Sequence, residues 1–252
     1  SKEPVTSKPS PLKALLSLAW PIIVSRSTQV VVGLADALMI AHLGEAALAA
    51  TTAGALNSVA AFILPMGIVF IVSSFSAQLT GRGDAVGARR YGWYGLLLAL
   101  LAQLVILALL PTLPWLLQHL DYAPDVAALM EAYLGIRLLS TGIVVGMEAL
   151  GNYYGGMGNT AILMKANLAA MLLNVPLNWL LIDGHMGFPA LGVRGAALAS
   201  VTSSAIAFGG FVAVFMWQGR GLGRLRLKLS EFGRFLRFGL PSGLNWGFEF
   251  FA

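Results

Sequence analysis

The sequence predicts an all-α membrane protein, and three observations lead to that fold class. Of the 252 residues, 58% are hydrophobic and 11% are charged, with a mean hydropathy of +0.79, whereas soluble domains are about 45–50% apolar and about 25% charged. The apolar residues fall in runs long enough to cross a bilayer as helices, which takes roughly 20 residues. The charged residues lie mostly between these runs. Membrane lipid is therefore the first expected partner.

Six complete segments meet this length, and a seventh has begun when the chain stops. The complete segments are residues 12–41, 46–79, 91–118, 126–150, 161–182 and 190–218, and the seventh starts near residue 235. The first is no cleaved signal peptide, because its apolar run is too long and contains Arg26 and Asp36. We expect tilt or kinks in the longer segments, since prolines within them interrupt backbone hydrogen bonding. These prolines are Pro21, Pro65, Pro111, Pro114 and Pro176.

The positions of the basic residues predict the orientation of the chain. Cytoplasmic loops are enriched in lysine and arginine, and one set of segment ends carries most of the 16 basic residues. The opposite loops carry Arg194 with Glu45, Asp121, Asp125 and Asp183. We therefore expect a multi-pass protein of the cell inner (plasma) membrane with a cytoplasmic amino terminus. The net charge of +5 is explained by topology, so no nucleic-acid partner is expected.

The sequence also predicts three divisions along the chain. Residues 1–218 form a six-helix transmembrane lobe, 219–234 a basic cytoplasmic connector, and 235–252 the start of a seventh transmembrane helix. The connector follows from "RGLGRLRLKLSEFGRFLR" at 220–237, a pattern typical of a basic amphipathic segment on the inner leaflet. "SLAWPIIVSRS" around Pro21 resembles "RFGLPSGLNWG" around Pro241, which favours parallel six-helix repeats. We expect this chain to be the front half of a longer protein, with a missing carboxy-terminal lobe as partner.

One face of the first segment is polar at membrane depth. Gln29, Gly33 and Asp36 are spaced i, i+4, i+7 and therefore share a helix face. A charged aspartate at mid-bilayer costs about 2.5–3.5 kcal/mol on insertion scales, so this face is expected to look into a wet cavity or at polar partners. The alternative is an idle, solvated Asp36 at the outer interface.

The fifth segment supplies the expected partners of Asp36. Asn167, Asn174 and Asn178 lie at i, i+7, i+11 in "KANLAAMLLNVPLNWLLI", and Pro176 is expected to kink the helix and free a carbonyl near Leu172. Amide, carbonyl and carboxylate oxygens suit Na⁺, or a proton with water. Helix–helix hydrogen bonding is the alternative, at about 0.6 kcal/mol per bond.

The remaining polar positions give weaker indications. Glu249 follows Asn245 by four residues among aromatic rings, which suits a proton or a cationic apolar ligand. Arg26 or Arg137 is expected to pair with an acid on another helix, and Glu148 is a further acid within a span. The three histidines have no metal-ligand spacing, cysteine is absent, and the glycine-rich stretches do not match a phosphate-binding loop. Neither an enzyme nor a cofactor is expected; energy would come from an ion gradient or another subunit.

Several stretches in order resemble the multidrug and toxic compound extrusion (MATE) family. They are "GLADALMIAHLGEAALAA" at 33–50, "AQLTGRGD" at 77–84 and "LLNVPLNWLLIDGHMGFPALGVRGAALAS" at 172–200. The Asn-x-Pro-x-Asn arrangement at 174–178 is similar to the NorM-type branch, whereas the DinF-type branch tends to have an aspartate in place of Asn178.

The resemblance implies a twelve-helix antiporter of two six-helix lobes, of which this chain is half. It would export small cationic, lipophilic drug-like compounds in exchange for Na⁺ or H⁺. The implied cation or proton site of the amino lobe is Asp36, Asn174, Asn178 and Ser200. Glu249 would be the carboxylate of the second lobe. The departure from the family pattern is length, because the rest of the carboxy lobe lies outside these residues.

Two other functions remain open at this stage. A lipid-linked oligosaccharide flippase of the same superfamily would use the same helices, but a groove rich in arginine and lysine would favour it, and here those residues are mostly cytoplasmic. A non-transporting seven-helix receptor or retinal protein would need a complete seventh helix and, for retinal, a buried lysine within it.

Overall fold

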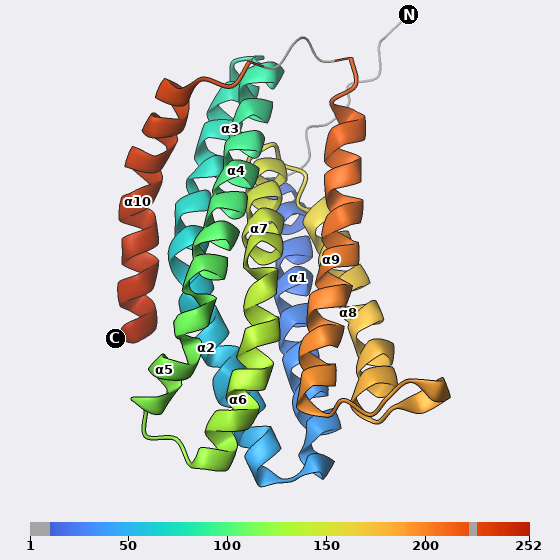
Figure 1. Ribbon diagram of the computed structural model, residues 1–252. Helices are drawn as coiled ribbons and strands as arrows, with labels where there is room; N and C mark the ends of the chain where they lie inside the picture. The colour runs from blue at the N-terminus through green and yellow to red at the C-terminus, as the bar shows by residue number, and fades with distance from the viewer. Residues whose placement is uncertain (1–10, 222–225) are drawn as a thin grey trace, which may run out of the picture.

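The computed structural model describes residues 11–221 and 226–252, and regular structure in this part of the chain is entirely helical (Figure 1). The helices are α1 Pro11–Ile40, η1 Ala41–Leu43, α2 Glu45–Val69, α3 Ile71–Gly81, α4 Ala85–Leu109, η2 Leu110–Thr112, α5 Leu113–Gln118, α6 Pro124–Arg137, η3 Leu138–Ser140, α7 Thr141–Gly156, α8 Ala161–Ile182, η4 His185–Gly187, α9 Val193–Gln218 and α10 Leu229–Phe251. Six helical stretches in these residues are long and apolar enough to span a membrane. The predicted fold class, six spans followed by a seventh helix, is confirmed.

Four of the six spans are composite rather than continuous, and the first of them joins α1 to η1. The second consists of α2 and α3, the third of α4, η2 and α5, and the fourth of α6, η3 and α7. In the third, the chain turns at Pro111, as proline in a span predicts. By contrast, α1, α2 and α8 run through Pro21, Pro65 and Pro176 as single helices.

The break in the fourth span contains no proline and is held by side chains instead. Gln103 on α4 accepts a hydrogen bond from Gly142 N–H at 2.8 Å and donates one to the Leu138 carbonyl at 3.4 Å. Ser140 Oγ donates to the Arg137 carbonyl at 2.7 Å. Irregular backbone at membrane depth requires such partners, because lipid offers none. The break therefore fixes the end of α6 and the direction of Arg137.

Small residues bring the helices close together. A Cβ atom added at Gly95 of α4 would lie 2.6 Å from Cβ of Ala149 on α7, so these two helices are in near backbone contact. The buried residues form two clusters, one around α3, α4, α7 and α9 and one around α2, α5, α6 and α9. Lipid tails are as apolar as the helix surfaces, so the hydrophobic effect does not drive helices together in a membrane. Close packing of small residues is a main source of helix association there.

The last helix begins at Leu229, before the predicted residue 235. Glu231 in its first turn forms an ion pair with Arg90 at 3.2 Å and accepts a hydrogen bond from the Tyr94 hydroxyl at 3.1 Å. An acidic residue is favourable at a helix amino terminus. These contacts extend the helix into residues assigned to the connector. The connector predicted over 219–234 is therefore too long at its carboxyl end, since α10 begins at Leu229. Residues 222–225 lie outside the described residues, and the cytoplasmic location of the connector stays a prediction.

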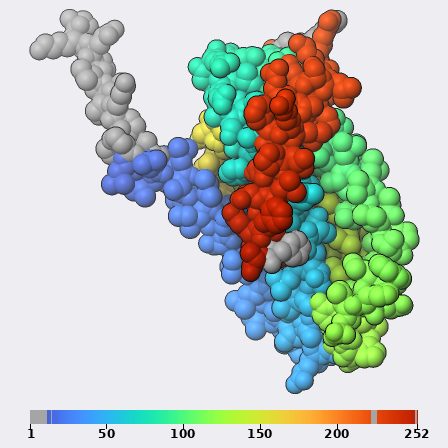
Figure 2. Space-filling view, turned by 90° about the vertical axis from the view of Figure 1, so that its left-hand side faces the viewer, coloured from blue at the N-terminus to red at the C-terminus, as the bar shows by residue number. Residues whose placement is uncertain are grey.

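Helix α10 lies along the outside of the bundle, against α2 and α3 (Figure 2). The approach to α2 is close because glycines face each other: a Cβ added at Gly67 would lie 2.6 Å from Gly243 Cα. A Cβ at Gly239 would lie 2.7 Å from the Ile68 carbonyl oxygen. Glycines four residues apart on one helix are a common close-packing device in membranes.

We expect Gly243→Leu to separate α10 from α2. Its Cβ would lie 2.7 Å from both the Leu64 carbonyl oxygen and Ile68 Cγ1, and overpacking costs about 1–3 kcal/mol. The measurement is cross-linking between cysteines placed at Phe70 and Trp246, whose rings lie 5.5 Å apart; native cysteines are absent from this chain. Gly247→Leu is the control, since nothing lies within 4 Å of a Cβ there. Equal yields in the two variants would contradict the proposed packing.

Candidate cation site

Four side chains from three helices form a closed ring of hydrogen bonds. Asn178 Nδ2 donates to Asp36 Oδ1 and, at 3.0 Å, to Asn174 Oδ1. Asn174 Nδ2 donates to Ser200 Oγ at 3.2 Å, and Ser200 Oγ donates to Asp36 Oδ2 at 3.3 Å. The ring joins α1, α8 and α9. The structure therefore brings together Asp36, Asn174, Asn178 and Ser200, the four residues that the sequence and the family resemblance single out.

The ring leaves one buried oxygen without a partner. Asn178 is fully buried and Asn174 is 1% exposed, and Asn178 Oδ1 has no hydrogen-bond donor among the described residues. Turning the Asn178 amide over would place this oxygen against two other oxygens, Asp36 Oδ1 and Asn174 Oδ1, so the orientation is fixed by the ring. A buried acceptor without a donor is costly and suits a cation.

The ring opens into a cavity of about 390 Å³ at the centre of the bundle. Asp36, Asn174 and Ser200 line it, together with Gln29 and Gly33 from the same face of α1. The opposite face of α1 is apolar and exposed, with Val30 71%, Leu34 59% and Leu38 67% exposed. Asp36 thus faces a chamber that polar and apolar side chains line together, and not the outer surface of α1.

Asn167 extends the polar contact between α1 and α8. Its Nδ2 donates to Ser25 Oγ at 2.6 Å, and the residue lines the same cavity. The predicted stripe of three asparagines on one helix face is therefore present. Pro176, between Asn174 and Asn178 in sequence, is exposed on the other side of α8, and Leu172 is 62% exposed and does not line the cavity. The kink and the freed carbonyl stay predictions.

A second polar cluster contains the predicted partner of Arg26. Arg26 Nη2 on α1 lies 3.0 Å from Glu148 Oε1 on α7, and Asn152 donates to the same carboxylate oxygen at 3.4 Å. The Glu148 side chain is only 8% exposed and lines the cavity. The expectation that one arginine pairs with an acid on another helix is confirmed for Arg26.

Arg137 is the cavity residue whose position the sequence does not predict. It ends α6 at the break in the fourth span, lines the cavity and interacts electrostatically with Asp36. The segment 126–150 looks continuous in sequence because it contains no proline. Ser140 and Thr141 are the residues that could have indicated the break, since hydroxyl side chains in a span can form hydrogen bonds with freed backbone groups.

Glu249 lies apart from these groups. It is exposed near the end of α10, accepts a hydrogen bond from Asn245 Nδ2 at 2.7 Å and is absent from the cavity lining. As predicted, Asn245 and Glu249 lie on the same face of the helix. The four-residue ring and Glu249 are therefore separate features in this part of the chain.

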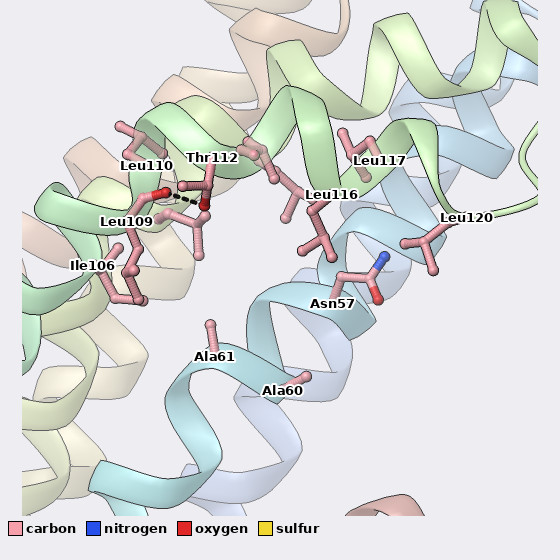
Figure 3. A pocket seen from close by; sticks show the side chains of 13 residues that line it. Asn57, Ala60, Ala61, Ile106, Leu109, Leu110, Thr112, Leu116, Leu117 and Leu120 are labelled. Carbon is pink, nitrogen blue, oxygen red and sulfur yellow. Dashed lines mark hydrogen bonds between the residues drawn. The ribbon is translucent and has the colours of Figure 1, made fainter.

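A second cavity, of about 330 Å³, has a different chemistry (Figure 3). It lies beneath the turn of α4, η2 and α5 and is lined mainly by leucine, isoleucine and alanine side chains. Its polar residues already have partners: Thr112 donates to the Leu109 carbonyl at 2.6 Å, and Asn57 to Tyr122 Oη at 3.3 Å. This cavity offers no free charge and is not a candidate cation site.

Comparisons with known proteins support one family. The family model described as MatE matches residues 21–180. The "probable multidrug resistance protein NorM" of Rhizobium meliloti (strain 1021) is 30% identical over 241 residues, which is 96% of this chain and 50% of that protein. The protein of the same description from Neisseria meningitidis serogroup A is 31% identical over 194 residues, 75% of this chain and 42% of that protein. The chain spans about half the length of the curated relatives it matches.

Solved structures share the fold of this chain. A multidrug resistance MATE family transporter of the MOP superfamily in an outward-facing conformation superposes with a TM-score of 0.82 at 24% identity, covering 93% of this chain and 52% of that one. A MOP superfamily transporter from Pyrococcus furiosus superposes with a TM-score of 0.79 at 25% identity, with the same coverage of each chain. From the matched residues and the fold together, the chain belongs to the MatE family of membrane transporters.

Proposed function

We propose that this chain is the amino-terminal half of a secondary active efflux antiporter, which exports cationic lipophilic compounds in exchange for Na⁺ or H⁺. The observation that carries the proposal is the ring of Asp36, Asn174, Asn178 and Ser200 at the wall of a central cavity. An intramembrane carboxylate facing a cavity is typical of ion pathways. The relatives described as probable multidrug resistance proteins support drug-like cations as the exported class.

The chemistry of the ring suits a small cation such as the coupling ion. Asp36 supplies a charged oxygen, Asn178 Oδ1 is a buried acceptor without a donor, and Ser200 supplies a hydroxyl oxygen. These hard oxygen donors are what Na⁺ prefers. A proton on Asp36 would neutralise the same charge. Either ion would replace part of the hydrogen bonding that now holds α1 to α8 and α9.

Exchange follows if the ion and the drug compete for Asp36. One carboxylate balances one positive charge, so binding of either cation lowers the affinity for the other. Loss of the Asp36 charge would also change the bonds between α1 and its neighbours, and each ligand would then favour a different side of an inward-facing and outward-facing equilibrium. Helix bending at α1 is the movement we propose, since Pro21 lies within it.

The remaining assignments complete the proposed transporter. The basic residues favour a cytoplasmic amino terminus in the inner membrane. Glu249 is exposed near the end of α10, where we propose that it meets the second lobe and a cation there. The cavity lining combines Arg137 with the acids Asp36 and Glu148, which favours a small cation over the phosphate-rich cargo of an oligosaccharide flippase.

Transport by the full-length protein in vesicles tests this function. A lipophilic cation is loaded, and a Na⁺ gradient or a pH gradient is imposed separately at the same membrane potential. We expect efflux to follow one of the two gradients and to stop when an ionophore collapses it. Efflux that is indifferent to both gradients would overturn the proposed antiport.

A further inference from the structure

The charges that line the central cavity are not all neutralised in the same way. Three charged residues line it: Asp36, Arg137 and Glu148. Glu148 already has a partner, because Arg26 Nη2 lies 3.0 Å from its carboxylate. Within residues 11–221 and 226–252, neither Asp36 nor Arg137 forms an ion pair. One negative and one positive charge therefore remain to balance each other across the cavity.

Ser140 holds both the backbone carbonyl and one side-chain nitrogen of Arg137, and Arg137 Nε is left without a partner among the described residues. Arg137 is the last residue of α6, where the helix dipole favours a cation. Its Nη1 donates to Ser140 Oγ at 3.2 Å, and Ser140 Oγ donates back to the Arg137 carbonyl at 2.7 Å. In the described residues, Arg137 Nε is buried and has no hydrogen-bond partner. The guanidinium thus keeps donor capacity that the surrounding protein does not use.

Tyr133 lies one turn before Arg137 on α6 and is 3% exposed. It interacts electrostatically with both Arg137 and Asp36. Asp36 and Arg137 line the same cavity and interact through their charges, without an ion pair between them. These three residues come from α1 and α6 and line one cavity. The hydrogen bonds to Asp36, by contrast, come from neutral groups on α8 and α9. The charge facing Asp36 therefore comes from the α6 side.

We propose that Arg137 sets the cation affinity of the cavity by competing with cargo cations for the charge of Asp36. In the unloaded cavity the guanidinium balances the carboxylate. An arriving Na⁺, proton or cationic drug takes over that role, and the cavity then holds an unbalanced Arg137. The inference rests on the proposed function, because it assumes that cargo cations bind at Asp36.

Two consequences follow from a built-in competitor. Cargo cations bind more weakly than they would to Asp36 alone, since each must overcome the interaction between Asp36 and Arg137. Release is faster for the same reason, because the guanidinium regains its partner when the cation leaves. Removing the charge of Arg137 should therefore tighten binding and slow turnover together, a combination that simple loss of structure does not produce.

Binding of tetraphenylphosphonium to purified full-length protein tests the proposal. This cation has no hydrogen-bonding group, so its affinity reports charge and apolar contact. We expect Arg137→Gln to bind it roughly tenfold more tightly, the size common for coupled neighbouring charges, and to transport it with a lower kcat and a lower KM. Arg137→Lys keeps the charge and should bind with near-native affinity. Arg220→Gln is the control, since that arginine is exposed and outside the cavity lining.

A double-mutant cycle with Asp36→Asn separates this inference from the proposed function. If Arg137 acts through Asp36, Arg137→Gln should no longer tighten binding in the Asp36→Asn protein. Unchanged or weaker binding by folded Arg137→Gln, or the same tightening in both backgrounds, would overturn the role of Arg137. If Arg137→Gln does not fold, Arg137→Lys decides: a tenfold gain or loss of affinity with the charge retained would overturn it. If the Asp36→Asn single variant binds tetraphenylphosphonium with native affinity, that result would instead overturn the proposed function.

Discussion

Asp36→Asn is expected to reduce gradient-driven drug efflux to the level of protein-free vesicles. The substitution keeps the size of the side chain but removes the negative charge that faces the cavity. Without that charge, neither Na⁺ nor a proton has a carboxylate to bind, and exchange loses its coupling. Efflux of a lipophilic cation from vesicles with an imposed gradient is the measurement. Because asparagine costs less than a charged aspartate in a membrane, insertion should remain intact.

Glu131→Gln is the matched control for this experiment. It also removes one acidic charge, but Glu131 is exposed on α6 and does not line the cavity. Its efflux should equal that of the native protein. Undiminished efflux in Asp36→Asn, with equal amounts of protein in the membrane, would contradict the ion-coupling role.

Asn178→Ala is expected to give the next largest effect. Asn178 donates to both Asp36 and Asn174, so its loss opens the ring and leaves two acceptors with one donor fewer. Each buried acceptor left unsatisfied costs about 1–3 kcal/mol, and a loss of this size in the coupled state corresponds to roughly a tenfold or greater fall in efflux. Initial rates of gradient-driven efflux, normalised to protein in the membrane, are the measurement.

Asn167→Ala provides the comparison on the same helix. Asn167 lines the same cavity, but its hydrogen bond goes to Ser25 rather than to the ring. Asn167→Ala and Asn178→Ala both remove an amide group from α8, so a general loss of packing between α1 and α8 would affect both variants alike. A fall in efflux for Asn167→Ala as large as that for Asn178→Ala would indicate packing, not ion binding.

The sequence predicted the polar face of α1 and its partners on α8 because helical spacing is a local property. Gln29, Gly33 and Asp36 share a face through their i, i+4, i+7 spacing, and all three line the cavity. The pairing of Asp36 with Asn178 was predicted because a charged carboxylate at membrane depth is unfavourable in free energy unless it has polar partners. Ser200 was identified by family resemblance alone, because a hydroxyl among small residues is more often a packing residue.

The features that escaped prediction depend on contacts between distant segments. The break at 138–140 exists because Gln103, on another helix, satisfies its backbone groups. The start of α10 at Leu229 depends on Arg90 and Tyr94 from α4. Hydropathy cannot report such contacts, since it describes each segment alone. The position of Arg137 at the cavity could not be foreseen for the same reason.

Ion release on drug binding tests the central claim most directly. Tetraphenylphosphonium is added to purified full-length protein in weak buffer, and released protons and Na⁺ are measured with a pH dye and a Na⁺-selective electrode. If cargo and coupling ion share the carboxylate on α1, native protein should release one of the two ions in proportion to the drug bound, and the Asp36→Asn protein should release neither. Drug binding without ion release in the native protein, or equal release in the variant, would contradict the account.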